Sequence, residues 1–361
     1  MKKVIIISIL GIAIFLSALF FFLCFNVFPK GSCKISSNYV DNRYNNCCLS
    51  DGNVIEINNK LYFNYNGNDS IFFYGIYEIG DNNSKRIYWD GPSFSPGNNL
   101  YKLQVYNNNL LFSNYTGDTS YEVSQNEIIP QFDENIYSFD LQKHQVNKLY
   151  SLKSEDEACE GYYYIINNKI YVFSNDKIYV SDDGISVEEL FSGLSSAVNK
   201  TAYEKLCYIS DDTLIYVSND NNLVKYDLLK NEQIGMLSLS SISNNTDNYG
   251  EVFICNGKSI ITTYDGDIIS VYDVSEKPKL IYSKQSTDYY SINSFEDNVF
   301  ISSKSIGLDM IDIKTGDTKT LVNTNVNDTY IFDDKWVYYV DSSGILNRIM
   351  QTGEHLEAVF K

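Results

Sequence analysis

The sequence predicts an all-β fold, a β-propeller of about seven four-stranded blades with six or eight left open, preceded by one N-terminal transmembrane helix. Three observations predict it: an uncharged apolar run opens the chain, the rest has a strand-forming composition, and short strand-like segments recur there at a near-constant interval. We therefore divide the chain into a cytoplasmic stub and signal anchor at 1–30, a stalk at 31–51 and a propeller at 52–361.

The N-terminal helix is predicted from the run Val4 to Phe25, which contains no charged residue. At about 1.5 Å per residue this helix is roughly 33 Å long, enough to cross the hydrocarbon core of a membrane. A secretory signal peptide has a shorter apolar centre followed by a small-residue cleavage site, and no such site follows here. We expect an uncleaved signal anchor, and a cleaved signal peptide stays the alternative.

The charges beside the apolar run do not decide its orientation, because Lys2 and Lys3 precede it while Lys30 and Lys34 follow it. Long domains cross membranes largely regardless of their charge. We therefore expect a single-pass protein of the cell membrane, with its N-terminus inside and the bulk of the chain extracytoplasmic.

The residues after Lys34 are strongly acidic, because they hold 24 of the 28 basic residues and all 46 acidic ones. Such a surface repels phosphate backbones, so nucleic acid is excluded as an expected partner. Tyr, Phe, Ile and Val are abundant and Ala is scarce, which favours strands over helices. Asn and Asp lie densely between the apolar runs, where turn residues belong.

A recurring pattern predicts the blades. Each copy has a polar turn, a β-rich strand, a second strand ending near Asp or Gly, and a third short apolar strand. Its β-rich strands are expected at 335–341, 297–301, 258–264, 213–218 and 168–174, with two looser copies at 109–114 and 60–65. Apolar stretches precede the five clear copies and supply a fourth strand: Tyr162–Ile166, Leu206–Ile209, Val252–Ile254, Tyr290–Ile292 and Tyr330–Phe332.

The interval between copies, about 37 to 46 residues, matches a four-stranded propeller blade. Two alternatives have different periods. A pair of β-sandwiches would not repeat at a constant interval, and a β-solenoid would repeat in shorter coils. The interval therefore favours the propeller.

The last copy carries a family resemblance. Tyr338-Tyr339-Val340-Asp341, followed by Leu346–Ile349 and by Thr352-Gly353, resembles the YWTD-type propeller repeat of low-density-lipoprotein-receptor relatives. It is most similar to the bacterial, membrane-anchored propeller domains of unknown function related to them. This resemblance implies a propeller used for binding, and it transfers no catalytic residue.

The cysteines outside the apolar run leave two interpretations open. Their even number in an exported domain permits disulfides, whereas small buried thiols on inner strands explain them equally well. The last three lie near equivalent points of successive repeats. The six are Cys33, Cys47, Cys48, Cys159, Cys207 and Cys255.

Several short motifs are candidate sites with simpler structural interpretations. Asp-rich segments could bind calcium, although none has the spacing of an EF-hand loop, and solvated turns are the simpler interpretation. Ser181–Gly184 resembles part of an Asp-box, which is itself a structural turn. The Asp-rich segments are Asp211-Asp212, Asn219–Asn222 and Asp265-Gly266-Asp267.

Tyrosine runs are candidates for an aromatic platform that binds glycans or peptides, because tyrosine combines a flat apolar face with a hydrogen-bonding tip. The runs are Tyr162–Tyr164 and Tyr289-Tyr290. Both fall where the first strand of a blade is expected, so core packing is the preferred interpretation.

No catalytic, cofactor-binding or metal-binding residue is assigned from the sequence. His144 and His355 are the only histidines, Glu188-Glu189 is an ordinary pair in so acidic a chain, and no G-x-S-x-G motif is present. The predicted function is a non-catalytic binding or scaffolding module for a protein, peptide or glycan. The alternative is an extracellular carboxylate-dependent hydrolase or lyase with its site at the propeller channel.

Overall fold

A computed structural model describes residues 11, 14, 15, 17, 29–50, 52–65, 73–89, 100–116, 121–124, 127–130, 133–152, 162–174, 177–182, 188–194, 206–244, 248–323 and 325–361. The anchor expected at 4–25 lies almost wholly outside this set. No helix within the set is both long enough and apolar enough to cross a membrane.

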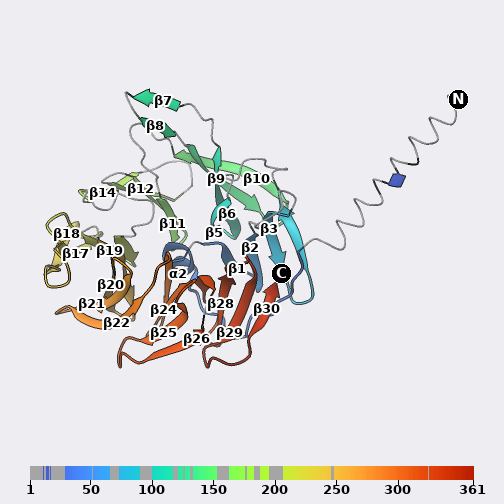
Figure 1. The fold of residues 1–361 in the computed structure, drawn as a ribbon. Coiled ribbons are helices and arrows are strands. Elements are labelled where there is room, and N and C mark those ends of the chain that lie inside the picture. The colour runs from blue at the N-terminus through green and yellow to red at the C-terminus, as the bar shows by residue number, and fades with distance from the viewer. Residues whose placement is uncertain are drawn as a thin grey trace.

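The chain forms a propeller of seven antiparallel four-stranded sheets, which confirms the all-β prediction and fixes the blade number (Figure 1). Blades 1 to 3 contain β1 (Val54–Ile57), β2 (Lys60–Tyr65), β3 (Gly75–Ile79), β4 (Ser84–Tyr88), β5 (Leu100–Tyr106), β6 (Asn109–Thr116), β9 (Asp133–Asp140), β10 (Gln145–Leu152), β11 (Tyr162–Ile166), β12 (Lys169–Ser174), β13 (Lys177–Ser181) and β14 (Glu188–Ser192).

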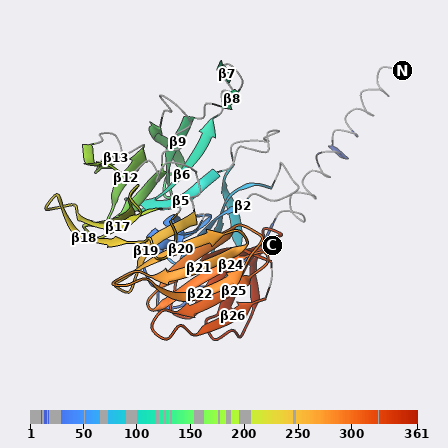
Figure 2. The same ribbon diagram turned by 60° about the vertical axis from the view of Figure 1, so that its left-hand side comes forward.

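Blades 4 to 7 follow the same order, each with its first strand innermost. They contain β15 (Cys207–Ser210), β16 (Thr213–Val217), β17 (Asn222–Asp227), β18 (Glu232–Ser238), β19 (Tyr249–Cys255), β20 (Lys258–Asp265), β21 (Ile268–Asp273), β22 (Lys279–Gln285), β23 (Tyr290–Phe295), β24 (Asn298–Ser303), β25 (Gly307–Asp312), β26 (Thr318–Val322), β27 (Val326–Tyr330), β28 (Trp336–Asp341), β29 (Leu346–Met350) and β30 (Glu357–Phe360). The insertion in blade 2 forms a hairpin, β7 (Tyr121–Ser124) with β8 (Glu127–Pro130), that stands away from the ring in two views (Figures 1 and 2).

Buried apolar clusters join neighbouring blades and close the ring. One cluster spans blades 3 to 6, and smaller ones join blades 1 and 2, blades 2 and 3, and blades 6 and 7. A further cluster packs Leu61 and Tyr77 of blade 1 against Tyr338 and Phe360 of blade 7. Because the faces of each sheet are covered by neighbours, apolar residues occur on both faces of the strands, and strict alternation is lost.

The same two-residue turn joins the first and second strands of six blades. The first turn residue has a positive φ in every case, a conformation that favours Asn, Asp and Gly and suits the twist of a hairpin. We call the end of the ring that carries these turns the turn face, and the opposite end, where the inner strands begin, the entry face. The six turns are Asn58-Asn59, Asn107-Asn108, Asn167-Asn168, Asp211-Asp212, Asn256-Gly257 and Glu296-Asp297.

The seventh blade differs because a longer loop, 331–335, joins β27 to β28, and the N-terminal segment packs on that loop. Tyr39 forms a β-bridge with Asp333, and the Ser36 N–H donates to the Asp333 carboxylate at 3.2 Å. Upstream, Lys30 and Lys361 exchange backbone hydrogen bonds of 2.8 and 3.0 Å along the outer edge of β30. The segment 31–51 predicted as a stalk therefore packs against the propeller over residues 31–50.

A short helix, α2 (Arg43–Cys48), lies near the middle of the ring (Figure 1). It contacts the inner strands β1, β5, β11 and β23. Asn46 is buried, donates to the Ile331 carbonyl at 2.8 Å and accepts from the Ile331 N–H at 2.9 Å. This buried polar network explains why a polar sequence belongs to the core here, since buried amides must find partners.

Candidate functional site

Most of the polar motifs noted in the sequence are structural turns. Asp211-Asp212 is one of the two-residue turns of the turn face. In the segment Asn219–Asn222, the side-chain Oδ1 of Asn221 accepts a 2.8 Å hydrogen bond from the Tyr249 hydroxyl, which ties blade 4 to blade 5. Ser181 ends β13, whereas Asp183 and Gly184 lie outside the described residues. These positions are therefore occupied by contacts within the fold.

The residues considered for catalysis also have local roles. His144 has φ of 53° and its N–H donates to the Asp140 carbonyl at 2.8 Å, so it closes the turn between β9 and β10. His355 also has a positive φ, of 55°. Glu189 pairs with Lys177 across β13 and β14 at 2.7 Å. Across the described ranges, no three His, Cys, Asp or Glu residues form a group that could hold a metal ion.

The five cysteines that the structure describes form no disulfide with one another: Cys33, Cys47, Cys48, Cys207 and Cys255. Cys159 lies outside the described residues. Cys207 begins β15 and Cys255 ends β19, so these two lie at opposite faces of the ring, which corrects the expectation of equivalent positions. The sequence repeat predicts where a strand lies but not at which residue it begins or ends, and this is why the two cysteines were expected at equivalent positions.

The position of α2 distinguishes the two faces of the propeller. Tyr44 accepts a hydrogen bond from the Ile209 N–H at 3.2 Å, and Asn45 donates to the Ser294 carbonyl at 3.2 Å. Ile209 and Ser294 each lie one residue before the end of their inner strands. The helix therefore fills the ring toward the turn face.

A hydrogen-bonded cluster lies at the entry face between blades 5 and 6. Glu251, on β19, is only 7% exposed. Its Oε2 atom accepts hydrogen bonds from the Tyr290 hydroxyl at 2.6 Å and the Thr262 hydroxyl at 2.9 Å. Burying a carboxylate is costly unless donors replace water, and these two hydroxyls do so. The cluster holds Tyr290 in place at the start of β23.

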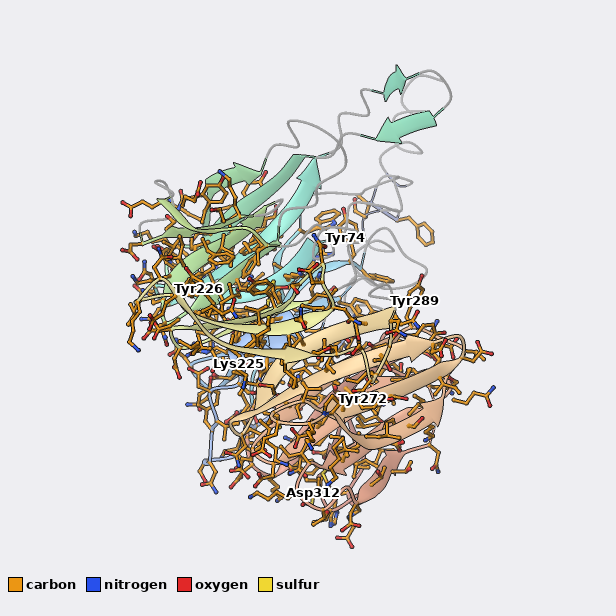
Figure 3. All side chains as sticks on the ribbon, turned by 90° about the vertical axis from the view of Figure 1, so that its left-hand side faces the viewer. Tyr74, Lys225, Tyr226, Tyr272, Tyr289 and Asp312 are labelled. Atoms are coloured by element: carbon orange, nitrogen blue, oxygen red, sulfur yellow. The ribbon has the colours of Figure 1, made fainter. Side chains whose placement is uncertain are left out.

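Exposed tyrosines continue from this cluster. The rings of Tyr264 and Tyr290 stack with centroids 6.5 Å apart and planes at 27°. Tyr264 is 37% exposed, and Tyr289 is 88% exposed. Figure 3 shows Tyr289 at the rim of the blades, away from Asp312 at the turn face. The preferred sequence interpretation, core packing, is correct for Tyr163 and Tyr164, which are buried, and wrong for Tyr289.

An open cleft of about 490 Å³ lies next to Tyr264, which directly precedes its lining residue Asp265. Ser286 links the two features, because its N–H donates to the Asp267 carbonyl at 2.6 Å and its carbonyl accepts from the Tyr264 hydroxyl at 3.5 Å. The cleft is lined by Asp265, Asp267, Ile268, Ser283, Lys284 and Gln285. We call Tyr264, Asp265, Asp267, Asp288 and Tyr289 the entry patch.

The entry patch differs from two turns of the turn face in how its charges are paired. At the turn face, Lys258 pairs with Asp273 at 2.9 Å and Lys230 with Asp227 at 3.1 Å. At the entry patch, no Lys, Arg or His of the described residues forms an ion pair with Asp265, Asp267 or Asp288; the structure's eleven ion pairs lie elsewhere. Within the part of the chain that the structure describes, the carboxylates of the entry patch are therefore not paired with a basic side chain.

Comparison with known proteins identifies the fold and no family. No protein-family model matches the chain, and no curated protein matches it. Similar solved structures include the WD40 β-propeller domain of Doa1 (12% identity, 90% of this chain and 97% of that one, TM-score 0.52) and Sqt1 of Saccharomyces cerevisiae (10%, 91% and 88%, TM-score 0.51). PorZ, a surface component of the type-IX secretion system of Porphyromonas gingivalis, is similar over 86% of this chain and 38% of its own (15%, TM-score 0.53). At these identities the likeness shows that the chain has a β-propeller fold and nothing finer.

Proposed function

We propose that this chain is a non-catalytic binding or scaffolding module, held at the outer face of the cell membrane by the segment 4–25, with a protein, peptide or glycan bound at the entry patch. The observation that carries the proposal is the 88% exposed Tyr289 beside the stacked pair Tyr264 and Tyr290 and the adjoining cleft. Large exposed aromatic residues around a cleft are typical of binding surfaces. The β-propeller fold, commonly a binding module, supports the proposal, and the apolar run supports the anchor.

The entry face is the better candidate of the two faces because α2 fills the ring toward the turn face. The buried carboxylates that the structure describes interact individually with neighbouring groups of the fold and do not form a catalytic pair. Asp309, for example, accepts from the Tyr282 hydroxyl and the Lys284 ammonium at 2.8 Å each. No specific arrangement among the described residues favours the hydrolase or lyase alternative.

The resemblance to YWTD-type propellers supports a binding role through the fold. Asp341 of the motif accepts hydrogen bonds from the N–H groups of Ser343 and Ile345 at 2.9 and 3.0 Å, and so closes the turn between β28 and β29. The motif residue that gives the resemblance thus stabilises a blade. The ligand must be recognised elsewhere.

The test is a screen of the full chain, purified in detergent, against immobilised peptides and glycans, with Tyr289→Ser as the site variant. Leu229→Ser is the matched control, because Leu229 is 77% exposed and lies in a turn of the turn face. We expect ligands whose binding is lost in Tyr289→Ser and kept in Leu229→Ser, with unchanged thermal stability of both. Binding indifferent to Tyr289, or turnover of glycosides or peptides by the purified chain, would contradict the proposal.

A further inference from the structure

The charge of the entry patch restricts the ligand beyond the proposed function. Asp265 ends β20, Asp267 is the second residue of the turn that leads to β21, and Asp288 directly precedes Tyr289. Of the six residues that line the cleft, one carries a positive charge, Lys284. Its ammonium lies 2.8 Å from the carboxylate of Asp309, which is only 1% exposed. This internal pair neutralises Lys284, so the cleft presents negative charge to a ligand.

The tyrosines add a second feature that suits cations. The faces of aromatic rings attract ammonium and guanidinium groups, more strongly where carboxylates lie nearby. The molecule already uses this contact, since the Arg348 guanidinium lies 4.3 Å from the Trp336 ring centroid. A side chain with a flexible apolar stem and a cationic tip could lie on Tyr289 and reach Asp288.

One of the strands that line the cleft is an edge strand, to which an extended chain can add. Ser283 and Gln285 belong to β22, the outermost strand of blade 5, which has no partner on its outer side among the described strands. Peptides recognise such edges with their own backbone hydrogen bonds, whereas sugars lack a matching repeat of donors and acceptors.

We propose that the entry patch binds a basic peptide segment, with Lys or Arg side chains paired to Asp265, Asp267 and Asp288 and stacked on Tyr289. This inference rests on the proposed function, and it narrows the ligand to cationic peptides.

The experiment measures binding of three capped octapeptides to the full chain: one alternating Lys with Ser, one alternating Glu with Ser, and one of Gly and Ser. The site variants are Asp265→Asn/Asp267→Asn and Tyr289→Ser. The matched control is Asp211→Asn/Asp212→Asn, which removes the same two charges from a turn of the opposite face. It therefore reports any general attraction between basic peptides and a chain of net charge −18.

We expect the lysine peptide to bind the native chain, and its dissociation constant to rise at least about fivefold in either site variant while staying within about twofold in the control. Equal losses in the site and control variants, no binding of the lysine peptide, or binding of the neutral or acidic peptide through Tyr289 would each overturn the inference. The last outcome would leave the proposed function standing. If the ligands found in the wider screen bind independently of the entry patch, both the proposed function and the basic-peptide inference are wrong.

Discussion

Many of the polar side chains buried among the described residues are matched with donors or acceptors, although the hydroxyls of Ser259 and Thr329 have no hydrogen-bond partner there. Glu251 is satisfied by two hydroxyls, and Asn46 by the backbone of Ile331. A buried hydrogen bond adds only modest stability, whereas an unmatched buried group costs about 1–3 kcal/mol. We therefore expect the strongest single-residue effects where a substitution displaces such partners.

Gly250→Ala tests the cluster around Glu251. A Cβ atom at this position would collide with the Tyr290 hydroxyl and lie 2.6 Å from the Thr262 hydroxyl, displacing both donors to the carboxylate. We expect a loss of about 1–3 kcal/mol in the free energy of unfolding. Gly235→Ala is the matched control in another strand, because its Cβ would meet its nearest neighbour at an ordinary 3.6 Å. Denaturant titration of both variants measures the difference, and equal stabilities would contradict the geometry of the cluster.

The thiol of Cys255 is expected to be inert in the folded chain. Burial, with the Asp297 carboxylate adding to it, raises the pKa of this thiol to about 12. Its S–H also donates to the Glu296 carbonyl at 3.2 Å. Since the thiolate is the reactive form, a thiol reagent should modify Cys255 only in denaturant. Peptide mapping of the modified chain checks this, and rapid native labelling of Cys255 would show that the turn face is more open than described.

The two-residue turns are the elements that the sequence predicts best. Each has a positive φ at its first residue, and in five of the six turns an Asn or Asp between two apolar runs signals this conformation locally, whereas Glu296 does not. The strand pattern therefore locates most blades, including blade 2, where β6 matches the looser copy at 109–114. The exposure of Tyr289 was not predictable from the sequence. The strand β23 begins at Tyr290, and a shift of its start by one residue decides whether Tyr289 belongs to the strand or to the loop before it.

The N-terminal segment could not be predicted from periodicity, because its contacts are distant in sequence and largely polar. Asn42 donates to Asn293 at 3.2 Å across the ring, and Ser50 donates to the Thr329 carbonyl at 2.6 Å. A polar stretch with such partners has the same composition as a solvated linker. The acceptors for its side chains come together only when the blades close into a ring.

Asn46→Ala tests the contribution of α2. The substitution removes both hydrogen bonds to the backbone of Ile331 and one from the buried Asn293, which keeps the bonds that it donates to Thr329 and Ser50. We expect a loss of at least about 2 kcal/mol in the free energy of unfolding. Asn38→Ala is the control from the same segment, because Asn38 makes an exposed hydrogen bond to Asp334. Its effect should stay below about 0.5 kcal/mol, and a similarly small effect of Asn46→Ala would mean that α2 is not part of the core.

The whole ring closes without exchange of strands between its first and last blades. β30 belongs to the seventh sheet, and residues 30–32 add hydrogen bonds along its outer edge. The Gly31 N–H then donates to Ser84 of blade 1 at 2.9 Å, and the Cys33 N–H donates to the Gly80 carbonyl at 2.9 Å. The N-terminal segment thus joins the last blade to the first.

The buried tyrosines make the whole fold sensitive to alkali. Burial raises the pKa of Tyr77, Tyr249 and Tyr339 from 10.0 to about 12. Unfolded tyrosines ionise first as pH rises, so their contribution to stability is complete below pH 10 and is lost between about pH 10 and 12. We expect these three side chains to ionise together with the loss of circular dichroism in that interval, measured as the difference in tyrosinate absorbance between the native chain and the variant Tyr77→Phe/Tyr249→Phe/Tyr339→Phe. Ionisation of these three side chains ahead of unfolding would contradict their burial.

Hydrogen exchange of the full chain tests the central claim most directly, that residues 40–50 fill the ring and leave the entry face for the ligand. The N–H groups of Asn46 and Leu49 donate within α2, to the Asn42 and Asn45 carbonyls at 2.9 and 3.0 Å. A six-residue helix has no lasting protection by itself, so slow exchange requires the packing that the ring provides. The account predicts that these amides exchange as slowly as those of the inner strands β19 and β23. Exchange at the rate of a free peptide would show that the helix does not occupy the ring.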